Sequence, residues 1–112
     1  MSQHDDGVRL QHMLDAAKQA GDFARGRSRV DLDRDLQLSL ALTRLVEIVV
    51  EAAKNVSPET RARLPKVPWR AMAGTRDRLV HAYFDVDHDQ LWQIVSTDLP
   101  ALVSVLEAAT YG

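Results

Sequence analysis

Residues 37–56, QLSLALTRLVEIVVEAAKNV, carry the clearest folding signal of this 112-residue chain. Their apolar side chains recur every three or four positions, as they do on one side of an α-helix: Leu38, Leu42, Leu45, Val49, Ala52 and Val56. The polar side chains form a second stripe, made of Gln37, Arg44, Glu47, Glu51 and Lys54. The spacing predicts a long amphipathic helix over residues 33–56, with its apolar stripe buried. Asp31 or Asp33 is expected to cap its first turn by accepting backbone N–H bonds.

The rest of the chain shows helical spacing too, and no segment alternates as a strand does. Three more long helices are expected, over about residues 6–24, from 68 to 83 or 84, and over 88–110. Pro100 lies inside the last one and should kink it or split it at Asp98. A short helix is expected from Ser57-Pro58 to about Leu64. Short links between long helices predict an all-α fold, an antiparallel four-helix bundle with an extra short helix, in one domain over residues 1–112.

Composition narrows the classes of protein that the chain can belong to. Hydrophobic residues make up 46% of it, enough for a core, and there is no cysteine, which excludes a disulfide scaffold and any thiolate metal site. No apolar run approaches the roughly 18–20 residues of a membrane helix. The first residues lack the basic start and apolar stretch of a signal peptide, so a cytoplasmic location is expected.

The formal net charge of −2 hides an uneven distribution. Residues 61–78 carry a local charge of +5, whereas residues 79–112 contain no Lys or Arg and carry −5. Arg accounts for 11 of the 14 basic residues, and its planar guanidinium binds phosphate through two N–H bonds. The basic segment is therefore either a surface for a nucleic acid or a set of solvated helix faces.

Few arrangements of chemically active residues are present. The four histidines do not form an i, i+4 pair on one helix: His4, His12, His81 and His88. No glycine loop for phosphate occurs. A Ser–His–Asp triad stays open, although no serine lies in a recognisable nucleophile turn. Neither a metal nor a cofactor is expected.

Arg76, His81 and Tyr83 are the strongest candidates for a site. On an ideal helix, at about 100° per residue, His81 lies about 140° from Arg76, whereas Tyr83 shares the face of Arg76. Either the helix distorts near His81, or two copies of the chain complete one site. The residue types suit RNA cleavage without metal, since a histidine can deprotonate a ribose 2′-hydroxyl and an arginine can clamp the phosphate. The tyrosine could stack on a base. Each residue could also be purely structural, because short motifs often match by chance.

The stretch WRAMAGTRDRLVHAYFDVD, residues 69–87, resembles the signature of HepT-like toxins in the HEPN superfamily. The family motif is Arg-x4-His-x-Tyr, and Arg76, His81 and Tyr83 fill its three positions. Residues 47–54 resemble the family's second-helix segment. Residues 91–94, with the later Leu99-Pro100, resemble its last helix.

The resemblance implies a HEPN-like bundle that forms a homodimer with both motifs facing one cleft. It implies a metal-independent endoribonuclease, the toxin of a type VII-like toxin–antitoxin pair, with Arg76 and His81 catalytic and Arg70 and Arg78 as further RNA contacts. The antitoxin of the family is a minimal nucleotidyltransferase that transfers AMP to the motif tyrosine, here Tyr83. Alternatively, the chain is a non-catalytic helical module that docks on such a nucleotidyltransferase.

The sequence leaves the role of two further regions unassigned. The charged link over residues 25–34 matches no family pattern. Glu47 and Glu51 could support the site across the bundle, but a plain solvated stripe is the favoured interpretation.

Overall fold

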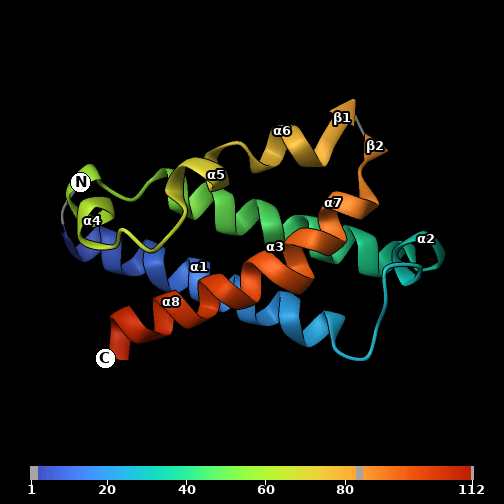
Figure 1. Ribbon diagram of the computed structural model, residues 1–112, viewed down its shortest axis with the longest axis horizontal. Helices are drawn as coiled ribbons and strands as arrows, with labels where there is room; N and C mark the ends of the chain where they lie inside the picture. Colours follow the sequence, from blue (N-terminus) through green and yellow to red (C-terminus); the bar gives the residue numbers. More distant parts are fainter. Residues whose placement is uncertain (1–2, 83–84, 112) are drawn as a thin grey trace.

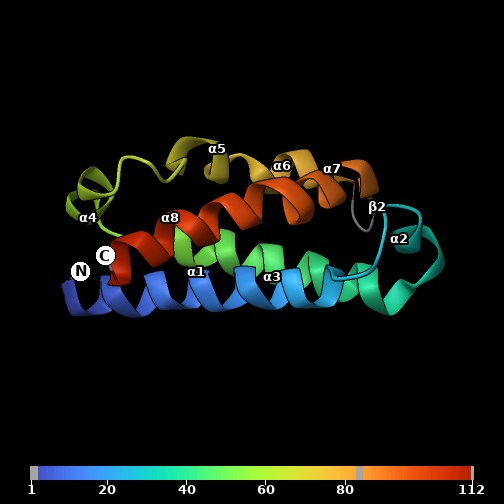
Figure 2. The same cartoon turned by 60° about the horizontal axis from the view of Figure 1, so that its bottom comes forward.

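The computed structural model describes the backbone of residues 3–82 and 85–111 and the side chains of residues 5–80 and 85–109. The fold is an elongated bundle, 42 × 29 × 19 Å, in which α1 and α3 run antiparallel along the long axis (Figures 1 and 2). The elements, in chain order, are α1 (Gln3–Ala24), α2 (Asp31–Arg34), α3 (Leu36–Lys54), α4 (Pro58–Arg63), α5 (Trp69–Ala73), α6 (Thr75–Leu79), β1 (Val80–Ala82), β2 (Asp85–Val86), α7 (His88–Gln93), the π-helical turn η1 (Ile94–Asp98) and α8 (Leu99–Tyr111).

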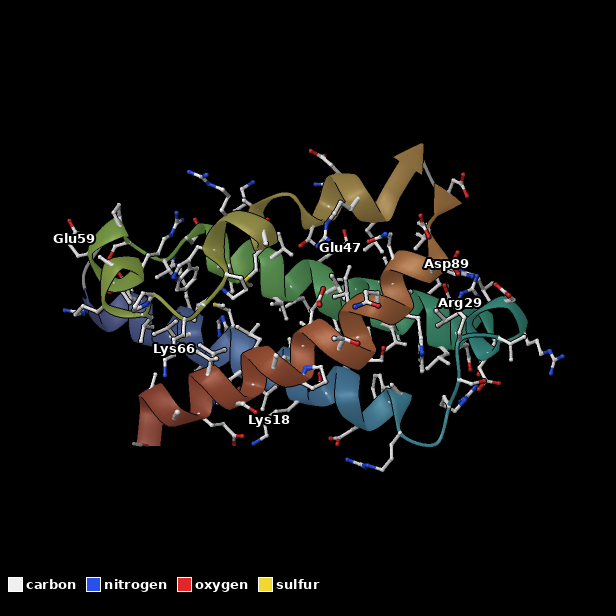
Figure 3. The ribbon with its side chains drawn as sticks, in the orientation of Figure 1. Lys18, Arg29, Glu47, Glu59, Lys66 and Asp89 are labelled. Carbon is white, nitrogen blue, oxygen red and sulfur yellow. The ribbon has the colours of Figure 1, made fainter. Side chains whose placement is uncertain are left out.

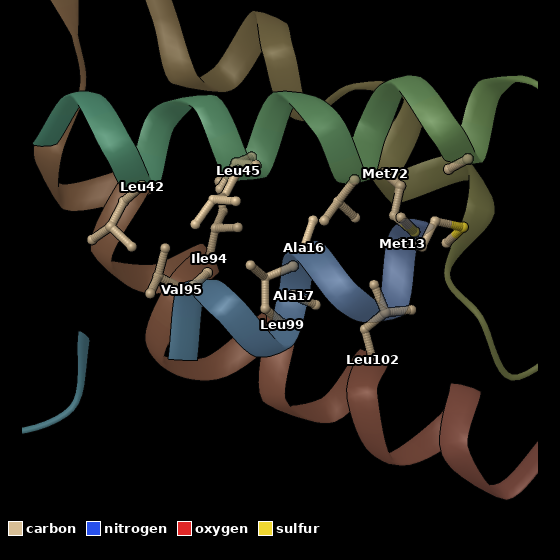
Figure 4. Packing of buried hydrophobic residues seen from close by; sticks show 14 of the residues in the cluster. Met13, Ala16, Ala17, Leu42, Leu45, Met72, Ile94, Val95, Leu99 and Leu102 are labelled. Carbon is tan, nitrogen blue, oxygen red and sulfur yellow. The ribbon is translucent and has the colours of Figure 1, made fainter. Parts of the chain in front are cut away.

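The core lies where α1, α3 and the last helix meet. Figure 4 shows Leu42 of α3, Leu99 of α8 and Met13 of α1 spread along the layer between these helices. Every apolar residue of the stripe expected for residues 33–56 is buried. The inward residues of the last helix are buried too: Leu91, Val95, Leu99, Leu102 and Leu106. The all-α fold class is therefore confirmed, and no described helix is long and apolar enough to cross a membrane.

The helix expected over residues 33–56 is broken at Asp35. That residue has an extended backbone, and its carboxylate accepts the backbone N–H of Leu38 at 3.1 Å, so it caps α3. The expectation that Asp31 or Asp33 is the cap was wrong. The carboxylate of Asp31 accepts the backbone N–H of Ser28 instead, at 2.7 Å, before α2 begins. Ser57 caps α4 and Asp87 caps α7, each by accepting a backbone N–H with its side chain.

The prediction of one continuous helix from residue 68 to 83 or 84 was wrong. The segment is divided at Gly74 into α5 and α6, and α6 ends at Leu79 because Val80 turns to extended backbone. A small antiparallel pair follows, β1 with β2, in which Val80 lies opposite Val86. The expectation that the chain contains no strand was therefore wrong at this point. Residues 83 and 84, the expected helix end, lie outside the described residues.

The last helix is split where the proline predicts it. Pro100 has no N–H, and its ring collides with the carbonyl one turn earlier in a regular α-helix. Residues Ile94–Asp98 form a wider π-helical turn directly before α8, which accommodates the proline without ending the helix.

Candidate active site

A hollow of about 510 Å³ separates α3 from α6. Glu47 and Glu51 line it from α3, and Arg76 and Val80 line it from the motif segment. Figure 3 shows Glu47 on the side of α3 that faces α6. Glu47 is half-buried and Glu51 is exposed, and both border the hollow.

Arg76 is exposed on α6 at the edge of this hollow. No carboxylate of the described residues lies within ion-pair distance of its guanidinium, although two of the glutamates border the same hollow. A guanidinium offers five N–H donors in a planar fork. Arg76 can therefore bind an anion without first giving up an ion pair with any of the described residues.

The end of α6 at Leu79 changes the geometry expected for the motif. Arg76 lies in the helix, whereas the backbone of His81 lies in β1, directly after Val80 at the hollow. The angle of about 140° from an ideal helix therefore does not apply. Of the two alternatives, a helix that departs from regular geometry near His81 agrees with the end of α6 at Leu79, and a site completed by two copies stays open. The His81 side chain and all of Tyr83 lie outside the described residues.

The basic segment over residues 61–78 divides into two parts. Arg61 donates to the carbonyls of Ala53 and Lys54 and lies 5.8 Å from the centre of the Trp69 ring, so it attaches α4 and α5 to α3. Arg63 donates to Thr60 Oγ1 within the first of these short helices. Three exposed arginines remain on α5 and α6: Arg70, Arg76 and Arg78. Lys66, on the link between α4 and α5, is exposed as well.

The basic residues of the link before α2 are held in ion pairs. Arg27 lies 2.8 Å from Asp35, and this hydrogen bond lowers the pKa of the Asp35 carboxyl. Arg29 lies 2.6 Å from Asp89 and 3.0 Å from Asp33. Figure 3 shows Arg29 and Asp89 meeting where the link approaches α7. The link that resembled no family pattern thus joins α2 to the last helix.

A Ser–His–Asp arrangement does occur in the structure. His88 Nδ1 lies 2.7 Å from Asp33 Oδ1, and His88 Nε2 lies 3.0 Å from Ser39 Oγ. Ser39 is only 5% exposed, so its hydroxyl is placed to hold the histidine and not to attack a substrate. The three residues are 49 and 55 positions apart along the chain, and no local spacing could have revealed them.

Comparison with known proteins agrees with the motif. A family model described as "Ribonuclease HepT-like" matches residues 13–109. "Probable ribonuclease HepT" of Thermococcus cleftensis is 37% identical over 98 residues, which cover 88% of this chain and 89% of that protein. "Putative RNase TTE0752" of Caldanaerobacter subterraneus is 37% identical over 93 residues, 83% of each chain. "Putative RNase MJ1380" of Methanocaldococcus jannaschii is 31% identical, over 96% of this chain and 98% of its own. No solved structure matches the chain. The protein therefore belongs to the HepT-like ribonuclease family.

Proposed function

We propose that the protein is a metal-independent endoribonuclease with Arg76 and His81 as its catalytic residues. His81 takes the proton of a ribose 2′-hydroxyl, whose oxygen then forms a bond to the adjacent phosphorus. The bond from phosphorus to the 5′-oxygen breaks, and the departing 5′-oxygen takes a proton from water, which leaves a 2′,3′-cyclic phosphate and a 5′-hydroxyl. Arg76 binds the phosphate oxygens as negative charge grows on them. The observation that carries the proposal is the exposed Arg76 at the hollow, with the segment that leads to His81 lining the same hollow.

Three other residues contact the RNA in this proposal. Tyr83 stacks on a base or hydrogen-bonds a phosphate oxygen. Arg70 and Arg78, both exposed, contact the backbone on either side of Arg76. Arg78 donates only to Thr75 Oγ1, at 3.3 Å, among the described residues. Such a neutral contact is readily exchanged for a phosphate, because bonds between charged groups are the stronger ones.

The test is cleavage of a labelled RNA by the purified protein in the presence of EDTA. We expect cleavage by the wild type and by His12→Ala, the matched control on the exposed face of α1. The His81→Ala variant should lose cleavage and keep the circular dichroism spectrum of the wild type. RNA binding without cleavage by the wild type would instead support the alternative, a non-catalytic module that docks on a nucleotidyltransferase.

The protein acts, in this proposal, as the toxin of a toxin–antitoxin pair, and its partner is a minimal nucleotidyltransferase. The phenolic oxygen of Tyr83 forms a bond to the α-phosphorus of ATP, loses its proton, and pyrophosphate leaves. A bulky anion beside Arg76 would then block the binding of RNA. Intact mass after co-expression with the partner should show added AMP on the wild type and on Tyr111→Phe. The same gain on Tyr83→Phe would contradict the assignment.

The protein forms a homodimer in this proposal, and the outward face of α3 supports it. Leu36 and Leu40 are 72% and 60% exposed, one turn apart. At about 100° per residue, Arg44 and Glu47 lie within about 80° of them around the helix. Large apolar residues exposed on one face often mark a protein interface. Because this face also borders the hollow at Arg76, a second copy seated on it would bring two motifs together.

The charges on this face favour a second copy over other partners. Along α3 the two leucines are followed by Arg44, Glu47, Glu51 and Lys54, two residues of each sign. A two-fold interface uses the same patch on both copies, so it needs both signs within that patch. An antiparallel pair of α3 helices would set basic residues of one copy against acidic residues of the other. These four charges sum to zero, so this face lacks the net positive charge that binding of RNA would need.

Light scattering after size exclusion tests the dimer. The wild type should show twice the chain mass of 12.5 kDa. Leu40→Asp should show the mass of one chain, whereas Ala108→Asp on the exposed side of α8 should remain dimeric. A monomeric wild type, or a dimeric Leu40→Asp variant, would contradict this interface.

A further inference from the structure

The hairpin of β1 and β2 is attached to the bundle at a narrow root. Leu79, which precedes β1, is 1% exposed in the core. The backbone N–H of Asp87 donates to the carbonyl of Leu79 at 2.7 Å, and Val80 lies opposite Val86. We call residues 79–80 and 86–87 the hairpin root. The backbone of His81 in β1 directly follows this root, so the root sets where that backbone lies.

The three residues that follow β2 fix the root to the rest of the molecule. Asp87 accepts the backbone N–H of Gln90 at 3.0 Å and so starts α7. His88 bridges α2 and α3, as described above, through both of its ring nitrogens. Asp89 binds Arg29 of the link at 2.6 Å. Successive side chains therefore reach three different parts of the chain.

His88 is the centre of this attachment. Its ring is rigid and half-buried, and its two nitrogens meet partners on different elements, Asp33 of α2 and Ser39 of α3. Arg29 closes the network, because it binds both Asp33 and Asp89. The hydrogen bonds from His88 and Arg29 lower the pKa of the Asp33 carboxyl, which keeps it anionic and paired.

We propose that His88, held by Asp33 and Ser39, is a positioning residue that sets the hairpin root and thereby the placement of His81 relative to Arg76. The inference rests on the proposed function, since it takes His81 as the reacting group. Arg76 comes from α6 on one side of the root, and His88 fixes the other side. A displacement of about 1 Å between reacting groups can cost on the order of a hundredfold in rate. A rigid root is therefore needed in a hairpin this short.

The experiment compares His88→Phe, which keeps a ring and removes both hydrogen bonds, with the wild type. We expect the kcat for RNA cleavage to fall at least tenfold while KM stays within twofold, because phosphate binding by Arg76 is untouched. We also expect faster amide hydrogen exchange at Asp87, whose N–H closes the root. His88→Asn should have a higher kcat and slower exchange at Asp87 than His88→Phe, since the asparagine amide can still donate a hydrogen bond to Asp33. Arg25→Ala is the matched control, because it breaks the exposed Arg25–Asp22 pair at the same end of the bundle.

Unchanged kcat and unchanged exchange in His88→Phe would overturn the proposal, as would equal changes in Arg25→Ala. Asp33→Asn is the second variant, used if His88→Phe does not fold, and its exchange at Asp87 must also rise. If the wild type cleaves no RNA, the proposed function fails, but hydrogen exchange still decides whether His88 fixes the root. Exchange that rises with no loss of kcat would show a fixed root without a positioning role, and would overturn the proposal.

Discussion

Asp6 is a buried carboxylate whose replacement should change how the protein responds to acid. It is 2% exposed on α1 and accepts three hydrogen bonds from α4 and its cap: from Ser57 N at 3.0 Å, Ser57 Oγ at 2.5 Å and Thr60 Oγ1 at 2.6 Å. These bonds lower its pKa from 3.8 to about 2. Asp6→Asn removes the negative charge. It also places an amide N–H donor where the hydroxyl groups of Ser57 and Thr60 donate their own hydrogens, so these hydrogens lose an acceptor.

The sign and size of the effect follow from the two pKa values. The carboxylate binds protons less readily in the folded state, so its contribution is complete above about pH 5 and is lost progressively as the pH falls to about 1. Between those limits the folding equilibrium constant of the wild type should fall by up to tenfold per pH unit from this group, about 60-fold in all. The Asn variant lacks this dependence.

Urea unfolding followed by circular dichroism at pH 7, 5, 4, 3 and 2.5 measures the free energy of unfolding and its dependence on pH. Asp6→Asn should be less stable than the wild type at pH 7, and the gap should narrow as the pH falls from 4 to 2.5. Asp98→Asn, an exposed carboxylate on η1, is the control and should show no such narrowing. A gap of equal size at pH 7 and pH 2.5 would refute the reasoning.

Three further predictions concern packing, the last helix and the site. Leu42→Ala should lower the free energy of unfolding by about 2–5 kcal/mol because Leu42 is fully buried, whereas Val8→Ala, 43% exposed, should change it by less than about 0.5 kcal/mol in the same urea assay. Pro100→Ala should raise it by up to about 3 kcal/mol, since alanine restores the missing N–H; a decrease would show that the proline itself stabilises the helix. Arg76→Lys should lower kcat/KM for RNA about ten- to hundredfold, because lysine cannot make the bidentate contact; full activity would remove Arg76 from the proposed mechanism.

The buried stripes were predictable because they depend only on local spacing. Leu38 to Val56 and Leu91 to Leu106 follow one period each, and burial follows that period. The break at Asp35 was not predictable in the same way, since the apolar spacing continues across it. Only the extended backbone of Asp35 and its bond to Leu38 reveal the new start. The short pair of strands was missed because Val80–Ala82 is too brief to show alternation.

In the candidate site too, features that depend on a local motif were predictable from the sequence, and features that depend on packing were not. Arg76 could be selected from the motif, and its exposure agrees with that choice. The placement of Glu47 at the hollow depends on how α6 packs on α3, which no spacing within either segment encodes. The His88 network depends on contacts between residues 49 to 60 positions apart. Such contacts become visible only when the chain is folded.

The wide turn η1 also sets the rotational phase of the last helix. From Leu91 to Leu106 there are fifteen residue steps, and at about 100° per step a regular α-helix would overshoot four full turns by about 60°. A π-helical turn rotates less per residue, so it takes up this excess. Leu91 at one end and Leu106 at the other can therefore both be buried, at 0% and 2% exposure. The turn works as one extra residue stored within the helix, so deleting Ser96 should leave a regular α-helix of fourteen steps whose rotation falls only about 40° short of four full turns, with both leucines still facing the core.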